Sequence, residues 1–210
     1  VWEYSLCLDW EPGSAGYLTW NDDILETPKR SRFTNLGLVD DSKFWMVVLG
    51  NVTLGGHPIG CQDGCGAVLD ITTPMLALPE TSYEKLGNAI AQLAPNCLSL
   101  SNMPHLRFTL DGHNYSLPPD AYFSRVFGNA SEDLLDHFKI DHFPNPKNSS
   151  CQAAIMKLTW NTSVGEMWVL GAPFFRSYYT VFVQDTLNMV YTAPAGDNCD
   201  LANETDKVNE

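Results

Sequence analysis

The chain has 210 residues, of which 44% are hydrophobic and 18% charged, a composition that indicates a globular protein and excludes global disorder. Its formal net charge of −13, from 25 acidic against 12 basic residues, argues against nucleic acid or an anionic membrane as a partner, since both require a basic surface. No apolar run approaches the ~20 residues needed to span a bilayer.

Strand patterns dominate the chain. Seven segments are rich in β-branched and aromatic residues, alternate with period two, or end at turn residues. A strand or hairpin is predicted up to the turn at Gly55-Gly56, and a hairpin is predicted at Asp111-Gly112, which is a strong hairpin signal. The expected strands lie in Phe44–Leu54, Leu106–Leu110, His113–Leu117, Ala153–Trp160, Trp168–Leu170, Tyr179–Val183 and Met189–Thr192. The pattern predicts a mostly β domain with a few short helices.

One longer helix is predicted before Pro95. Thr81 and Glu84 fit a capping box with Thr81 as the N-cap, and apolar residues follow at helical spacing. Shorter helices are expected around 118–122 and after Gly171. The apolar positions of the longer helix are Leu86, Ile90 and Leu93.

Two stretches look peripheral. Residues 124–150 combine glycosylation sequons, an acidic patch and prolines, which predicts a surface insertion. The Asp-His pairs at 136–137 and 141–142 lack the spacing of a helical metal site, so we expect a solvated loop there and no metal. Residues 196–210 predict an acidic, polar tail, part of which Cys199 could tie down.

Cysteines and sequons indicate the compartment. Six cysteines, an even number, predict disulfide bonds rather than a metal site, and no cofactor motif is present. Six Asn-x-Ser/Thr sequons predict N-glycosylation. We therefore expect a glycoprotein that is secreted, lies in the lumen of an acidic compartment, or is displayed at the cell surface. The sequons begin at Asn51, Asn114, Asn129, Asn148, Asn161 and Asn203.

The segment from Cys61 to Pro79 carries the most chemical information. An apolar run ends at Asp70, two threonines follow closely, and a second apolar run leads to the proline. A carboxyl in this setting should be desolvated, and its pKa should be raised unless hydrogen-bond donors compensate. Asp70 is therefore a candidate acid or base.

This segment resembles the second lobe of pepsin-like aspartic peptidases. That lobe has a small disulfide loop, an apolar strand, Asp-Thr-Gly-Thr-Ser and an apolar run that ends near a proline. The matching parts here are Cys61–Cys65, Asp70 and Met75–Pro79. Three further elements keep the family's order: the aromatic hairpin of 44–56, the hairpin of 103–122, and Val169-Leu170-Gly171, which packs behind the aspartate loop. The resemblance implies that residues 1–195 form the C-terminal lobe of the bilobal pepsin-like fold.

The resemblance also implies how the cysteines pair. Cys61–Cys65 is similar to the family's small loop, and Cys97–Cys151 is similar to its second disulfide. Cys7 and Cys199 are left over. They either pair with each other, because both termini approach the interlobe sheet in the family, or bond to a partner chain.

In this family, one aspartate from each lobe shares a proton with the other, and the pair activates a water that attacks a peptide bond. Asp70 is similar to the second-lobe aspartate. No other aspartate here has a matching setting, so this chain alone should be inactive. The implied partner is an N-terminal lobe, from the same precursor or from a separate chain, and the implied ligand is a peptide or protein.

The motif departs from the family in three of five residues, because Asp70 is followed by Ile71-Thr72-Thr73-Pro74. Ile71 cannot make the family's hydrogen bond across the lobes, and Thr72 adds a side chain beside the carboxylates. Pro74 lacks the hydroxyl and the N–H of the usual serine, whereas Thr73 is retained and could hydrogen-bond Asp70. Weakened or lost catalysis is predicted. Three interpretations stay open: an endopeptidase subunit, a non-catalytic glycoprotein that binds a protein or peptide or has a structural role, and, with least support, a symmetric homodimer.

Overall fold

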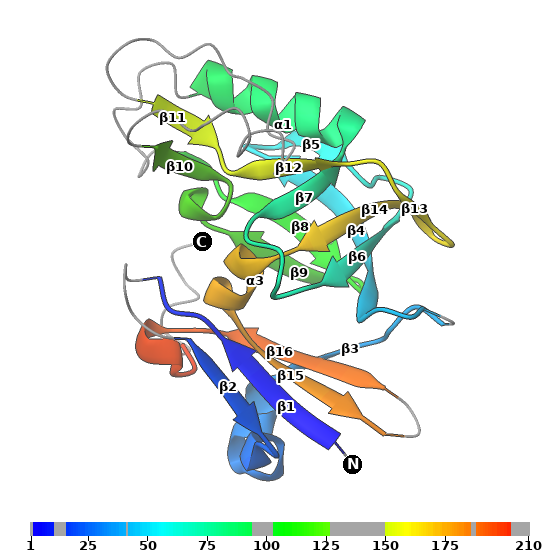
Figure 1. The fold of residues 1–210 in the computed structure, drawn as a ribbon, viewed down its shortest axis with the longest axis vertical. Helices are drawn as coiled ribbons and strands as arrows, with labels where there is room; N and C mark the ends of the chain where they lie inside the picture. Colours follow the sequence, from blue (N-terminus) through cyan, green and yellow to red (C-terminus); the bar gives the residue numbers. More distant parts are fainter. Residues whose placement is uncertain are drawn as a thin grey trace.

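The computed structural model describes residues 2–10, 16–40, 42–93, 103–126, 150–185 and 188–202. These residues form two main sheets with few helices, as Figure 1 shows. The expected fold class, a mostly β pepsin-like lobe, is confirmed. Most of the predicted insertion at 124–150, the residues after Ala202, and Cys97 lie outside the described residues.

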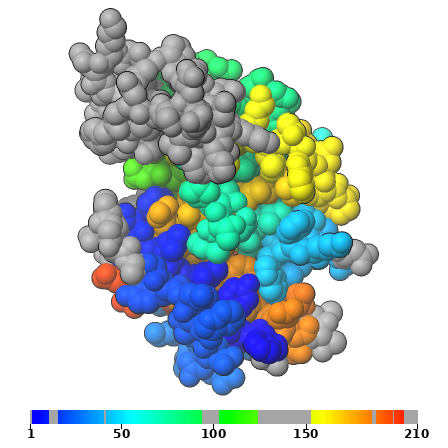
Figure 2. Space-filling model, in the orientation of Figure 1, coloured from blue at the N-terminus to red at the C-terminus, as the bar shows by residue number. Residues whose placement is uncertain are grey.

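A five-stranded antiparallel sheet brings the first and the last described strands together. Its order is β2-β1-β15-β16-β3, and β1 pairs with β15 from Trp2↔Gln184 to Leu6↔Thr180. The N-terminal and C-terminal segments accordingly share the lower part of the molecule in Figure 2. The strands are β1 (Trp2–Cys7), β2 (Tyr17–Trp20), β3 (Thr34–Leu36), β15 (Tyr178–Gln184) and β16 (Met189–Pro194), and the short 3-10 helices η1 (Asp23–Glu26) and η2 (Pro28–Arg32) follow β2.

A larger, nine-stranded sheet carries most of the predicted strands. Its main path is β12-β7-β14-β6-β4-β8-β9, with β5 paired to β4 and β13 paired to β14. The hairpin predicted around Asp111-Gly112 is confirmed, with both strands at the predicted bounds. The strands are β4 (Met46–Leu54), β5 (His57–Gly60), β6 (Cys65–Leu69), β7 (Leu76–Pro79), β8 (Leu106–Leu110), β9 (His113–Leu117), β12 (Ile155–Leu158), β13 (Asn161–Thr162) and β14 (Gly165–Leu170). A separate pair consists of β10 (Phe123–Val126) and β11 (Ser150–Ala153).

In the described part of the chain, the helices are short apart from α1 (Glu80–Leu93). Because α1 begins at Glu80, Thr81 lies inside its first turn and not at the expected N-cap position. The chain passes directly from β7 into this helix, and Glu80 is bound there by a 2.7 Å salt bridge to Lys157 of β12. The two other predicted helices are present as η4 (Pro119–Ala121) and α3 (Ala172–Ser177), and a further short turn is η5 (Asp197–Cys199).

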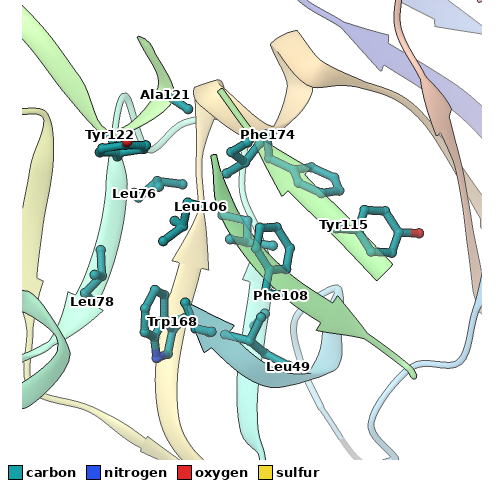
Figure 3. Close-up of a cluster of buried hydrophobic side chains, with 14 of the residues drawn as sticks. Leu49, Leu76, Leu78, Leu106, Phe108, Tyr115, Ala121, Tyr122, Trp168 and Phe174 are labelled. Carbon is teal, nitrogen blue, oxygen red and sulfur yellow. The ribbon is translucent and has the colours of Figure 1, made fainter. Parts of the chain in front are cut away.

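The main core joins the two sheets. Figure 3 shows aromatic and leucine side chains from several strands and from α3 gathered around Leu106 and Phe108. Trp168 and Phe174 are fully buried in this cluster, which continues to Phe182 of the five-stranded sheet. Because strands from both sheets share one core, the end of β6, where Asp70 lies, is held against a rigid base.

Candidate active site

The loop that carries Asp70 crosses the end of a strand. Strand β14 lies between β6 and β7 in the sheet, so the loop from Asp70 to Met75, which joins β6 to β7, must pass over the end of β14. The Asp70 N–H donates to the Leu170 carbonyl at 3.2 Å, and the Ala172 N–H donates to the Thr73 carbonyl at 2.8 Å. These two bonds fix the loop to the end of β14.

Gly171 makes this crossing possible. A Cβ atom at this position would stand 2.3 Å from the carbonyl oxygens of both Thr73 and Met75. The glycine is required for space and not for conformation, because its φ of −85° is open to any residue. The Val169-Leu170-Gly171 element therefore packs directly against the loop that bears Asp70.

Three donors surround the Asp70 carboxylate. Its Oδ1 atom accepts from the Thr72 N–H at 2.9 Å and from the Thr72 hydroxyl at 2.7 Å. Its Oδ2 atom accepts from the Thr73 hydroxyl at 2.8 Å. The hydrogen bond from Thr73 is the one suggested by the sequence, whereas the Thr72 hydroxyl is a donor that sequence reasoning treated only as a steric obstacle. An aspartate followed two residues later by a threonine was the available signal, because aspartate side chains often accept from that N–H in an Asx turn.

The pKa of Asp70 lies below its ordinary value. Burial is the largest single influence and raises the pKa, but the hydrogen bonds from the Thr72 hydroxyl, the Thr73 hydroxyl and the Thr72 N–H together outweigh it. Each of these donors stabilises the charged form. The donors thus compensate for desolvation, and Asp70 is a carboxylate at mildly acidic pH.

The other altered motif residues have different surroundings. Ile71 is partly buried and packs against the main core of its own chain, so its side chain contributes to the stability of this lobe. Pro74 and Thr72 are exposed. The apolar residue in place of the family's threonine is thus accommodated by packing within the chain.

A pocket of about 460 Å³ borders Asp70. Its walls are mainly apolar, and Lys43 is the only other charged residue among those that line it. Two aromatic side chains on its rim are unusually open to solvent, Phe44 at 53% and Trp160 at 62% exposed. The sequence pattern predicts both residues within strands, but they lie just outside β4 and β12, and nothing in the pattern indicates that they share a pocket with Asp70. The lining residues are Lys43, Phe44, Trp45, Val68, Leu69, Asp70, Leu158, Trp160, Met167 and Val169.

The described residues form two disulfide bonds. Cys61 is joined to Cys65, the first residue of β6, and Cys7 of β1 is joined to Cys199. The bond between Cys7 and Cys199 anchors the beginning of the predicted acidic tail, where the Ala202 N–H also donates to the Pro194 carbonyl at 3.0 Å. The pairing of Cys97 with Cys151 lies outside the described residues.

The sequons divide into two groups. Asn51, Asn114 and Asn161 are exposed, as a glycosylated residue must be. The remaining three, Asn129, Asn148 and Asn203, lie outside the described residues, as do the Asp-His pairs at 136–137 and 141–142. Among the residues that the structure describes, no cluster of three or more histidine, cysteine, aspartate or glutamate side chains could hold a metal ion, and no helix is long and apolar enough to cross a membrane.

Comparison with known proteins agrees with this geometry. A family model described as eukaryotic aspartyl protease matches residues 31–194. Pepsin A of Bos taurus is 28% identical over 158 residues, which cover 72% of this chain and 37% of the bovine protein. Pepsin A of Sus scrofa is 29% identical over 181 residues, covering 79% of this chain and 42% of the porcine protein. The chain thus spans less than half the length of the curated relatives it matches.

Proposed function

The chain belongs to the eukaryotic aspartyl protease family, and from this we propose that it is the C-terminal lobe of a secreted pepsin-like endopeptidase. In this proposal an N-terminal lobe, from the same precursor or as the second chain of a two-chain protein, supplies the other aspartate. The observation that carries the proposal is the Asp70 carboxylate, which lies at the end of β6 with both oxygens hydrogen-bonded.

The chemistry requires two carboxyl groups with different protonation. Asp70, whose pKa is lowered by the hydrogen bonds that it accepts, takes a proton from a water molecule as that water attacks the peptide carbonyl. The aspartate of the other lobe holds the shared proton and polarises the carbonyl oxygen, because two carboxylates this close cannot both stay ionised. No cofactor or metal enters this reaction.

The pocket beside Asp70 supports a peptide or protein as the substrate. Its walls are aromatic and aliphatic, which suits the burial of an apolar side chain next to the bond to be cleaved. We expect residues of this class to be preferred at that position.

A second candidate function is a non-catalytic glycoprotein that binds a protein or peptide or has a structural role. The altered motif favours it. Ile71 packs into its own lobe instead of reaching across, and Pro74 lacks a hydroxyl for substrate. In the first candidate the same changes weaken catalysis; in the second they abolish it.

The test is cleavage of a denatured protein at about pH 3–5, where one proton is shared by an aspartate pair. The material is the full protein with both lobes, with and without pepstatin. We expect slow, pepstatin-sensitive cleavage that Asp70→Asn abolishes and that Asp63→Asn, in the exposed loop before β6, leaves unchanged. Undiminished cleavage by Asp70→Asn would refute the proposed mechanism. Pepstatin binding without cleavage would establish the second candidate.

Secretion is part of the proposal. It is supported by the two disulfide bonds and by three exposed sequons, because both modifications arise in an oxidising, glycosylating compartment. Secreted protein treated with an N-glycosidase should lose mass, and the loss should shrink stepwise in Asn51→Gln, Asn114→Gln and Asn161→Gln. An unchanged mass after treatment would argue against the secretory route.

A further inference from the structure

We propose that Thr72 is a positioning residue whose hydroxyl keeps Asp70 in the carboxylate form and thereby makes Asp70 the charged member of the aspartate pair. The first part concerns this chain alone, and the second part rests on the proposed function. The feature that leads to it is the concentration of three donors on one carboxylate, two of them from Thr72.

The arrangement on Oδ1 favours the charged form. A carboxylate offers about four acceptor positions, two on each oxygen. Both positions on Oδ1 are filled by Thr72, one by its N–H at 2.9 Å and the other by its hydroxyl at 2.7 Å. A proton added to Oδ1 would require the Thr72 hydroxyl to turn from donor to acceptor, because the backbone N–H can only donate. Oδ1 therefore favours the charged form, and Oδ2 is the easier oxygen to protonate.

Oδ2 is occupied in part. It accepts from the Thr73 hydroxyl at 2.8 Å, which leaves one acceptor position for a donor from outside the loop. In the paired protein that donor is the attacking water or the protonated carboxyl of the other lobe. Asp70 can therefore accept a proton at Oδ2 during the reaction while the Thr72 bonds hold Oδ1.

Of the three departures from the Asp-Thr-Gly-Thr-Ser pattern, the hydroxyl at position 72 is the one that donates to Asp70. A glycine at position 72 would still offer its N–H but has no hydroxyl, so one of the three donors would be absent. Thr72 is exposed, so its side chain contributes little to the core. Its hydroxyl and its N–H both donate to Asp70.

Few other charges act on Asp70 from the neighbouring elements. Lys43 shares the pocket with it. The strands β6 and β7 and the loop 71–75 carry no titratable side chain, because Cys65 is bound in a disulfide. In β14, Glu166 lies near the end opposite to Leu170. Arg176 lies in the last turn of α3, over the Trp10 ring. All of these remain in place when Thr72 is changed, so a change in Asp70 titration can be assigned to the hydroxyl.

Three variants separate the hydroxyl from the shape of the residue. Thr72→Val keeps the shape and the N–H but removes the hydroxyl, Thr72→Ser keeps the hydroxyl, and Thr72→Gly keeps only the N–H. Thr19→Val, at an exposed position on β2, is the matched control. The readout is the titration of the Asp70 carboxyl by carbon-13 NMR in the full chain, with the resonance identified from its loss in Asp70→Asn.

We expect the Asp70 midpoint to move upward in Thr72→Val and Thr72→Gly and to stay at the parental value in Thr72→Ser and Thr19→Val. In the protein with both lobes, the acid limb of kcat/KM, which reports the free enzyme's base, should move upward in the same two variants. Equal midpoints for Thr72→Val and the parent, or for Thr72→Val and Thr72→Ser, would overturn the proposal for Thr72. A shifted titration with an unmoved acid limb would overturn the assignment of Asp70 as the charged member. A complete lack of cleavage at every pH would refute the proposed endopeptidase function instead and leave the titration result intact.

Discussion

Replacing Gly171 with alanine should destabilise the protein and disturb Asp70 at the same time. The added Cβ would stand 2.3 Å from two backbone carbonyl oxygens, whereas contacts below 3.0 Å are essentially never seen, so the loop and the end of β14 must separate. Their separation weakens the hydrogen bonds from the Asp70 N–H to Leu170 and from the Ala172 N–H to Thr73. Overpacking and a weakened buried hydrogen bond each cost about 1–3 kcal/mol, so we expect the free energy of unfolding to fall by ~2–6 kcal/mol.

The assay is urea unfolding of the oxidised chain, with Gly56→Ala as the control. Gly56 has nothing within 4 Å of its added Cβ but a φ of +82°, so its replacement carries only the conformational cost of about 1–2 kcal/mol. Gly171→Ala should lower the free energy of unfolding more than Gly56→Ala does. Of the two variants, only Gly171→Ala should alter the Asp70 carboxyl resonance. A loss below ~0.5 kcal/mol for Gly171→Ala, with an unchanged resonance, would refute the reasoning.

Three other predictions follow from contacts outside the site. Replacing Cys7 and Cys199 by alanine should lower the free energy of unfolding in urea by ~5 kcal/mol, and replacing Cys61 and Cys65 should lower it by only ~2 kcal/mol. The reason is that the two bonds close sequence separations of 192 and 4 residues. Equal losses would contradict this loop-entropy argument. Tyr115→Phe should cost about 1–3 kcal/mol, since the buried Thr192 hydroxyl loses its 2.6 Å partner, and a neutral result in the same assay would show that Thr192 finds another. Burial, with a contribution from Asp22, raises the pKa of Tyr179 to about 12. The folded state therefore holds this proton more tightly than the unfolded state. The resulting stabilisation of the fold is complete below about pH 10 and is lost as the pH rises through the pKa of the folded state. Ultraviolet titration should show one tyrosine fewer ionising near that value in Tyr179→Phe, and an unchanged curve would argue against this assignment.

The sequence predicted the nine-stranded sheet better than the five-stranded one. The strands β8 and β9 show regular alternation around an Asp-Gly turn, so local chemistry defines both strands and their register. The strand β2 is exposed at all four residues, which leaves no buried face to impose a period of two. The strand β1 pairs with β15, which is more than 170 residues later in the chain. A local sequence pattern cannot predict pairing between strands so far apart.

The surroundings of Asp70 were predictable only in part. Its place at the end of an apolar strand follows from the sequence, and so does the competition between desolvation and donors. Whether desolvation or hydrogen bonding has the larger effect on the pKa depends on the turn from Asp70 to Thr73. This turn directs the N–H and the hydroxyl of Thr72 at the same oxygen. The pocket rim was missed for a related reason, because Phe44 and Trp160 come from segments that become neighbours only after β4, β6 and β14 have paired.

The strand order of the five-stranded sheet also constrains when it can form during synthesis. The two partners at its centre, β15 and β16, are made last, whereas β1, β2 and β3 are made first. A ribosome must therefore complete residues 178–194 before the earliest strands acquire their main neighbours, and Cys7 must wait for Cys199. Until then the first strands expose unpaired edges, which other chains or chaperones can bind. The nine-stranded sheet faces a shorter delay, since β4, β5, β6, β8 and β9 emerge close together and can pair while the rest of the chain is still being translated.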